Sequence, residues 1–257
     1  MSLDSSNSIW QASWQQQSGA KPEDILYTRF TKKAFRNFKR FIDRNDKLIL
    51  EAGCGTGRLC CLLGESFSNS MIVGIDITQE SLDIANKLKQ YLGVDNVEFK
   101  KGDIFKLDYP DEYFDVVFNN GVIEHFPLGQ KNNYNNALAE MLRVLKPGGK
   151  IIIDVPNWYC FAHTFYKWLL KITGKQYSFG YEKSFKRSEL ITLFKARGLE
   201  KIQLRAYDFA HGVFRLQGNH FLIRLLADIL YLIENPIFED LFGFMLLIKA
   251  EKPLNKQ

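Results

Sequence analysis

Three glycines and two acidic residues occur at a spacing that suits the binding of a nucleoside. Glu51 is followed by Gly53, Gly55 and Gly57, and Asp76 ends the next apolar run of the chain. A run of glycines between a strand and a helix lets a ligand approach the backbone closely. Asp76 lies about 20 residues beyond this loop, the offset at which an acidic residue meets a ribose in dinucleotide-binding folds. The pattern therefore predicts an adenosine-type site.

The spacing of the glycines separates two classes of ligand. The pyrophosphate-binding pattern is Gly-x-Gly-x-x-Gly, whereas this loop has Gly-x-Gly-x-Gly and is preceded by Glu51. An anion at Glu51 disfavours a phosphate and favours an ammonium group. S-adenosyl-L-methionine carries an ammonium, a sulfonium and a ribose, so it suits both acidic positions. A nicotinamide-dependent oxidoreductase is a less favoured alternative.

Five segments in order resemble the motifs of class I S-adenosylmethionine-dependent methyltransferases. Residues 51–57, Glu-Ala-Gly-Cys-Gly-Thr-Gly, resemble the first motif. Residues 74–77 resemble the ribose-binding motif, 102–104 the adenine-binding motif and 114–117 the fourth strand. Residues 145–149, Leu-Lys-Pro-Gly-Gly, resemble the turn before strand five. Within the family, the chain is most similar to the small-molecule group that includes the quinone-biosynthesis methyltransferases.

The resemblance implies an α/β fold, a Rossmann-like doubly wound sheet of seven strands with an antiparallel last strand. It also implies an enzyme that uses S-adenosyl-L-methionine. Asp103 is expected to accept from the adenine amino group, and the backbone of Ile104 to address a ring nitrogen. The expected cofactor-binding residues are Glu51, Gly53, Gly55, Gly57, Asp76, Ile77, Asp103, Ile104 and Asn119.

The loop after the fourth strand is expected to carry the chemistry, because ligands bind outside the carboxyl ends of parallel strands. It contains Asn119, Glu124 and His125. His125 is the expected general base, since an imidazole can take a proton at neutral pH. The competing interpretation is that His125 only shapes the cofactor pocket. The loop lacks the proline pair of base methyltransferases, and Glu124 has no second acid nearby in the sequence, which disfavours protein-arginine methylation.

Seven strands and two insertions must position these residues. Apolar runs predict strands at 48–50, 71–75, 97–99, 114–118, 151–155, 200–207 and 242–250. We expect an N-terminal cap helix region at 1–44, with a helix from Pro22 to Arg44, and a methyltransferase domain at 45–257. Insertions at 156–185 and 208–241 are rich in aromatic or apolar residues and are expected to cap the acceptor site.

Trp10 and Trp14, at helical spacing, are expected to dock on something apolar.

Composition and residue spacing limit the partners and ligands that we expect for this protein. The formal charge of +5 is spread along the chain, so no nucleic acid partner is expected. The cysteines show no disulfide or Cys-x-x-Cys pattern, and the histidines show no metal-ligand spacing, so we expect reduced thiols, a cytoplasmic protein and no metal. The apolar run 221–233 is too short for a transmembrane helix. Nothing in the sequence indicates an oligomeric state.

Methyl transfer needs little acid-base machinery, so the motifs identify the cofactor and say little about the acceptor. We expect a small, partly apolar acceptor, such as a lipid-like or quinone-like molecule, methylated by direct displacement. A noncatalytic module that binds S-adenosylmethionine is the alternative from another class.

Overall fold

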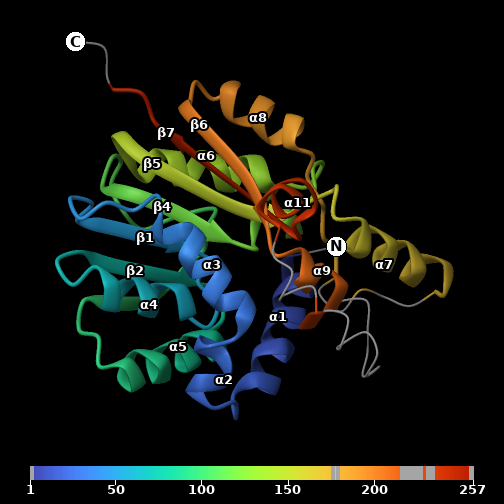
Figure 1. Cartoon of the computed structure of the whole chain (residues 1–257). Helices are drawn as coiled ribbons and strands as arrows, with labels where there is room; N and C mark the ends of the chain where they lie inside the picture. Colours follow the sequence, from blue (N-terminus) through green and yellow to red (C-terminus); the bar gives the residue numbers. More distant parts are fainter. Residues whose placement is uncertain (1–2, 175–176, 178–179, 215–227, 230–234, 255–257) are drawn as a thin grey trace.

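The computed structural model describes residues 3–174, 177, 180–214, 228–229 and 235–254. A twisted sheet runs through the centre, and helices cover both of its faces (Figure 1). The strands are β1 Leu48–Ala52, β2 Met71–Asp76, β3 Val97–Lys101, β4 Phe114–Asn120, β5 Leu145–Pro156, β6 Glu200–Tyr207 and β7 Met245–Glu251.

The strand order is β3-β2-β1-β4-β5-β7-β6, and β7 runs antiparallel to both of its neighbours. The other pairs are parallel. The chain therefore has the predicted Rossmann-like sheet with an antiparallel last strand. The order reverses between β1 and β4, which is the place where open α/β sheets bind ligands.

Side chains alternate between the two faces of the sheet along each strand, and they form a separate hydrophobic core on each face. Leu50 and Val117 belong to the cluster on one face, whereas Ile49 and Val116 belong to the cluster on the other. Successive side chains of a strand point to opposite faces, so an unbroken apolar run serves both layers. This explains why the central strands read as continuous apolar segments in the sequence.

Helices from both halves of the chain complete these cores. The helices that follow the first strands are α4 Arg58–Ser66 and α5 Gln79–Leu92, and those on the later strands are α6 Tyr134–Val144 and α8 Arg187–Lys195. Leu59 and Leu63 of α4 join the cluster around Ile49, while Leu138 of α6 joins the cluster around Leu50. A short 3₁₀ turn, η1 Ile123–His125, follows β4.

The N-terminal region contains three helices where the sequence predicted one from Pro22 to Arg44. They are α1 Leu3–Gln17, α2 Pro22–Leu26 and α3 Arg29–Lys39. The single-helix prediction is wrong because Thr28 leaves the helical conformation, and its hydroxyl accepts from the backbone N–H of Thr31 at 3.0 Å. This cap starts a new helix. Phe38 of α3 is fully buried against Phe118 of β4.

One predicted strand boundary also differs. Helix α6 begins at Tyr134, where Asn133 caps it, and it ends at Val144. Strand β5 begins directly at Leu145, before the Pro-Gly-Gly sequence that was expected to separate the two elements. Leu145 pairs with Phe114, with a register shift before the next pairs, so the ladder accommodates the proline and glycines.

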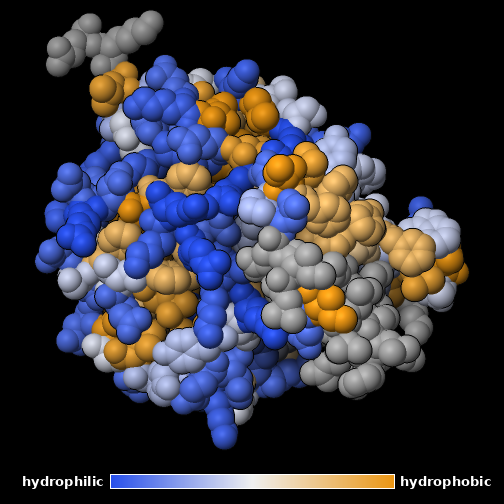
Figure 2. All heavy atoms as spheres, in the orientation of Figure 1, coloured by the Kyte–Doolittle hydropathy of each residue, from blue (hydrophilic) through white to orange (hydrophobic). Residues whose placement is uncertain are grey.

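The insertions contain α7 Phe161–Ile172, α9 Phe209–Phe214 and α11 Pro236–Phe242. Figure 2 shows apolar surface around α11 and along α7, and the exposed side chains there include Phe165, Trp168 and Ile237. Most of the apolar run 221–233 lies outside the described residues. No helix in the described ranges is long and apolar enough to cross a bilayer.

Candidate active site

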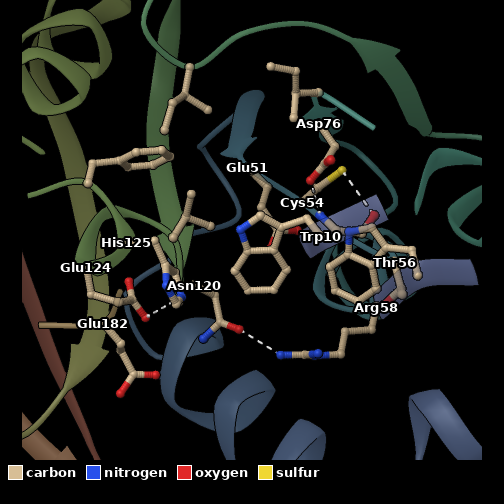
Figure 3. A pocket seen from close by; sticks show the side chains of 18 of the residues that line it. Trp10, Glu51, Cys54, Thr56, Arg58, Asp76, Asn120, Glu124, His125 and Glu182 are labelled. Atoms are coloured by element: carbon tan, nitrogen blue, oxygen red, sulfur yellow. Dashed lines mark hydrogen bonds and ion pairs between the residues drawn. The ribbon is translucent and has the colours of Figure 1, made fainter. Parts of the chain in front are cut away.

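A cavity of about 360 Å³ opens at the carboxyl ends of the parallel strands. Glu51 of β1, Asp76 of β2 and Asn120 of β4 contribute to its wall, and Met245 reaches it from the start of the antiparallel β7. Figure 3 shows these polar side chains converging around Trp10. The cavity therefore lies at the switch in strand order.

Two glycines shape the loop between β1 and α4. Gly53 has φ +82°, and a Cβ there would lie 2.7 Å from the side chain of Val122. Gly55 has φ +51°, and its N–H donates to Asp76 Oδ2 at 2.8 Å. Both glycines line the cavity, so the loop presents bare backbone to a ligand, and Asp76 fixes its conformation.

Two of the predicted site residues lie elsewhere. Gly57 does not line the cavity, since a Cβ there would lie 2.4 Å from the Phe99 ring, which makes this glycine a packing requirement. Asn119 is fully buried, and its side-chain amide donates to the carbonyl of Ala52 at 2.6 Å. The neighbouring Asn120 lines the cavity instead. Direct cofactor contacts are therefore not expected from Gly57 and Asn119.

The remaining predicted residues gather at one end of the cavity, where Asp76, Ile77, Asp103 and Ile104 all contribute to the lining. Asp76 Oδ1 accepts from the N–H and the hydroxyl of Thr78 at 3.0 and 2.8 Å. Asp103 Oδ1 accepts from the N–H of Phe105 at 3.0 Å. An ionised carboxylate has about four acceptor sites, so both groups keep capacity for a ligand. Their role in cofactor binding remains a prediction.

Glu51 lies in the middle of the cavity wall and is buried. Its carboxylate accepts from the thiol of Cys60, with 2.9 Å between Sγ and Oε2. Burial is the main cause that raises the pKa of Glu51 to about 7, because the charged form is poorly solvated there. This carboxyl group can therefore change its charge near neutral pH when a cation binds beside it.

Helix α1 brings two tryptophans over the cavity. The Trp14 ring lies 3.3 Å from the position that a Cβ of Gly55 would take. Trp10 stacks on Trp14 with 5.7 Å between ring centroids and meets the His125 ring edge to face at 4.9 Å. The spacing of the two tryptophans indicated docking on something apolar. Their place over the glycine loop required the tertiary structure.

His125 lies in η1 on the cavity wall and is 8% exposed. Its Nδ1 lies 2.7 Å from the carbonyl oxygen of Tyr181. Because a carbonyl only accepts, we assign the proton of the neutral ring to Nδ1, and Nε2 is then the basic nitrogen. Nε2 lies 3.9 Å from Glu124 Oε1. This tautomer suits a general base.

A second acid joins Glu124 from a distant part of the chain. Glu182, within the first insertion, lines the same cavity, and the N–H of Lys183 donates to the carbonyl of Glu124 at 3.0 Å. Glu124 therefore has a second acid nearby in the folded chain, although none is near it in the sequence. Glu182 is already engaged, since its two oxygens lie 2.8 Å from His163 Nε2 and from the hydroxyl of Tyr177.

Several cavity residues had no distinctive signal in the sequence. Phe30, Arg58 and Phe244 each belong to ordinary helical or strand patterns, and they meet only because α3, α4 and β7 converge. The further lining residues that were not among the predicted site residues are Gln17, Cys54, Thr56, Gly102, Phe105, Gly121, Val122, Phe126, Pro156 and His211.

The sheet order and the glycine loop define a Rossmann-like α/β protein with a nucleoside-type site at its switch point. A family of methyltransferase domains matches residues 43–189, more than half of the chain. The demethylmenaquinone methyltransferase of Oceanobacillus iheyensis is 30% identical over 186 residues, which cover 66% of this chain and 76% of that protein. The chain belongs to the methyltransferase domain family.

Solved structures share the fold at lower sequence identity. An S-adenosylmethionine-dependent methyltransferase from Thermotoga maritima has a TM-score of 0.65 at 18% identity, covering 95% of this chain and 99% of that chain. The phosphoethanolamine N-methyltransferase 2 of Haemonchus contortus, crystallised with S-adenosylhomocysteine, has a TM-score of 0.66 at 16% identity. It covers 96% of this chain and 60% of that chain.

The chain is an S-adenosylmethionine-dependent methyltransferase, and the cavity suits its cofactor. Carboxylates at Glu51, Asp76 and Asp103 line the wall, beside bare backbone at Gly55. These carboxylates accept hydrogen bonds, and they match the donors of the cofactor, which are an ammonium, two ribose hydroxyls and an adenine amino group. When bound, the cofactor supplies an activated methyl group. The protein has to hold both ligands in line and exclude water.

Binding of S-adenosylhomocysteine is expected to release about half a proton at pH 7. Glu51 is about half protonated there because its pKa is raised to about 7. An ammonium beside it would lower that pKa and expel the proton. Affinity should therefore increase as the pH rises from 6 to 8 and then level off. Calorimetry in buffers of different ionisation enthalpy measures the release.

The matched control for this release is Glu51→Gln, which keeps the shape of the side chain and cannot titrate. Its binding should release no proton. Equal proton release by the wild type and by Glu51→Gln would rule out Glu51 as the linked group.

Proposed function

We propose that this enzyme methylates a small, partly apolar acceptor of the quinone-like class. The observation that carries the proposal is the apolar lining of the cavity away from Asp76 and Asp103. That lining includes Trp10, Phe30 and Phe244. Flat aromatic walls suit a ring-shaped acceptor, since offset or edge-to-face ring contacts stabilise it beyond area burial.

His125 would remove the proton of the acceptor hydroxyl. Its Nε2 is the basic nitrogen, and the carbonyl of Tyr181 holds the ring in this tautomer. The other cavity residues would align the acceptor and keep water out, because the cofactor brings the activated group. The demethylmenaquinone methyltransferase relatives support a quinone-like acceptor.

We further propose that residues 1–44 and the insertions 156–185 and 208–241 form the cap of the acceptor site. Trp10 and Phe30 come from the first of these segments, Pro156 and Glu182 from the second, and His211 from the third. Each contributes a side chain to the cavity, which supports this division into a cap and a domain at 45–257.

Transfer of a labelled methyl group tests the proposed function. S-adenosylmethionine with a labelled methyl is incubated with the enzyme and a reduced 2-substituted 1,4-naphthoquinone, and in parallel with histamine as an amine acceptor. We expect label in the naphthoquinol and none in histamine. Label in histamine alone would show that the methyl acceptor is an amine and not a quinone-like molecule. Binding of S-adenosylhomocysteine without transfer to any acceptor would favour the noncatalytic module.

A further inference from the structure

One cation of the cavity wall, Arg58, forms no ion pair with any residue that the structure describes. Arg58, the first residue of α4, donates from Nη2 to the neutral amide oxygen of Asn120 at 2.9 Å. Within the described part of the chain, its Nε is buried without a hydrogen-bond acceptor. We propose that Arg58 binds an anionic oxygen of the methyl acceptor, an ionised hydroxyl or a carboxylate. The inference rests on the proposed function and narrows its substrate class.

The placement of Arg58 suits contact with the acceptor. Its guanidinium carbon lies 5.4 Å from the centre of the Phe30 ring, and both residues line the cavity. Figure 3 shows the side chain reaching across toward Asn120, away from Asp76. Asp76 marks the expected adenosine end of the cavity, so Arg58 faces the other end, where Phe30 of α3 and Phe244, just before β7, supply aromatic walls.

Two carboxyl groups lie near Arg58 without forming an ion pair with it. Glu51 and Asp154 interact with the guanidinium electrostatically, but no carboxylate of the described residues forms an ion pair with it. Asp154 Oδ2 accepts from Asn120 at 2.7 Å and from the Tyr207 hydroxyl at 2.5 Å. Burial raises the pKa of Asp154, like that of Glu51, to about 7, so each is only partly ionised at neutral pH.

A guanidinium stays protonated at any ordinary pH, and Arg58 is partly buried, with its Nε fully buried and without an acceptor among the described residues. Such a buried donor is costly to leave without a partner. An anionic ligand removes that cost, and it gains charge-assisted hydrogen bonds from the remaining N–H groups. The cation–π contact with Phe30 orients the guanidinium plane beside an aromatic wall. The site therefore combines a flat apolar wall with one positive charge, which matches an acidic aromatic acceptor.

A purely structural role is the competing explanation. Arg58 could serve only to hold Asn120, and through it Asp154 and the end of β4. In that case its replacement would lower stability without changing the preference for charged ligands. A second alternative is that Arg58 binds the carboxylate of the cofactor, which is also an anion.

The test uses calorimetric titration of the full chain with paired ligands. In the presence of S-adenosylhomocysteine, the protein is titrated with 2-hydroxy-1,4-naphthoquinone, which is ionised at neutral pH, and with neutral 1,4-naphthoquinone. The wild type should prefer the ionised compound by at least about tenfold. Arg58→Met should abolish this preference and leave the affinity for S-adenosylhomocysteine within about twofold.

Two further variants and a control complete the design. Arg58→Gln keeps an amide donor toward Asn120 but has no charge, so it should lose the preference even if Arg58→Met folds poorly. Arg58→Lys should recover part of the preference for the ionised compound, since lysine restores the positive charge but lacks the planar guanidinium that can donate two parallel hydrogen bonds. Arg36→Met removes one charge from an exposed site on α3 and should change nothing.

Three outcomes would overturn the proposal. The first is an unchanged preference in folded Arg58→Gln. The second is weaker binding of S-adenosylhomocysteine with unchanged binding of 5′-methylthioadenosine, which lacks the amino acid, because Arg58 would then serve the cofactor. If the wild type binds neither naphthoquinone, the acceptor is not quinone-like, and binding of the anion 1-naphthoate is then compared with binding of the neutral 1-naphthalenemethanol. The third outcome that would overturn the proposal is that the wild type shows no preference for 1-naphthoate.

Discussion

Replacing His125 with alanine is expected to lower the turnover number by about 10²- to 10⁴-fold, the usual contribution of a positioned general base. The hydrogen bond between Nδ1 and the carbonyl of Tyr181 leaves Nε2 as the basic nitrogen on the cavity wall. Affinity for S-adenosylhomocysteine should stay within about twofold, because the adenosine end of the cavity is untouched. Single-turnover methyl transfer to a naphthoquinol measures the loss.

His125→Asn separates proton transfer from positioning. Its amide nitrogen can replace Nδ1 as the donor to Tyr181, but the side chain has no basic nitrogen. A general base predicts a loss of similar size for His125→Asn and His125→Ala. Near wild-type turnover in His125→Asn would show that the ring only shapes the pocket, and alignment would remain as the catalytic device.

Replacing Asp76 with alanine should weaken the binding of S-adenosylhomocysteine about 10²-fold. Charge-assisted hydrogen bonds to two ribose hydroxyls are worth about 1.5 to 3 kcal/mol. The same carboxylate also accepts from the N–H of Gly55 at 2.8 Å, so its loss releases the glycine loop. Both consequences act in the same direction, and calorimetry reports their sum.

Asp83→Ala is the matched control, since it removes an exposed carboxylate from α5, the helix that follows β2, and Asp83 does not line the cavity. Its affinity should equal that of the wild type. If Asp76→Ala also binds within twofold of the wild type, Asp76 is not the ribose ligand, and its role is confined to the loop.

The sequence was sufficient for the fold because the relevant signals are local. Short apolar runs such as Leu48–Leu50 indicated strands buried on both faces, and the glycine loop indicated the turn into α4. The resemblance to class I methyltransferases then implied a doubly wound sheet with an antiparallel last strand, which the structure confirms. Helix ends were less predictable, because caps such as Thr28 depend on one side-chain hydrogen bond.

The functional site was predictable only in part, because local patterns do not show how distant segments meet. Asp76 and Asp103 both line the cavity, because Asp76 ends β2 and Asp103 follows β3 at the same edge of the sheet. The prediction named Asn119, whereas Asn120 lines the cavity, because neighbouring strand residues point to opposite faces and a shift of one residue exchanges them. The sequence also could not separate the packing role of Gly57 from a ligand role.

Tertiary contacts decided the rest of the cavity. Trp10 and Glu182 lie far from the glycine loop in the chain, and they reach the cavity only when α1 and the first insertion fold over it. The environment of Arg58 is likewise a property of the assembled site, since the described residues around its guanidinium offer Nε no acceptor. Local patterns specify strands, turns and cofactor motifs, whereas the acceptor end is built from long-range packing that no single segment encodes.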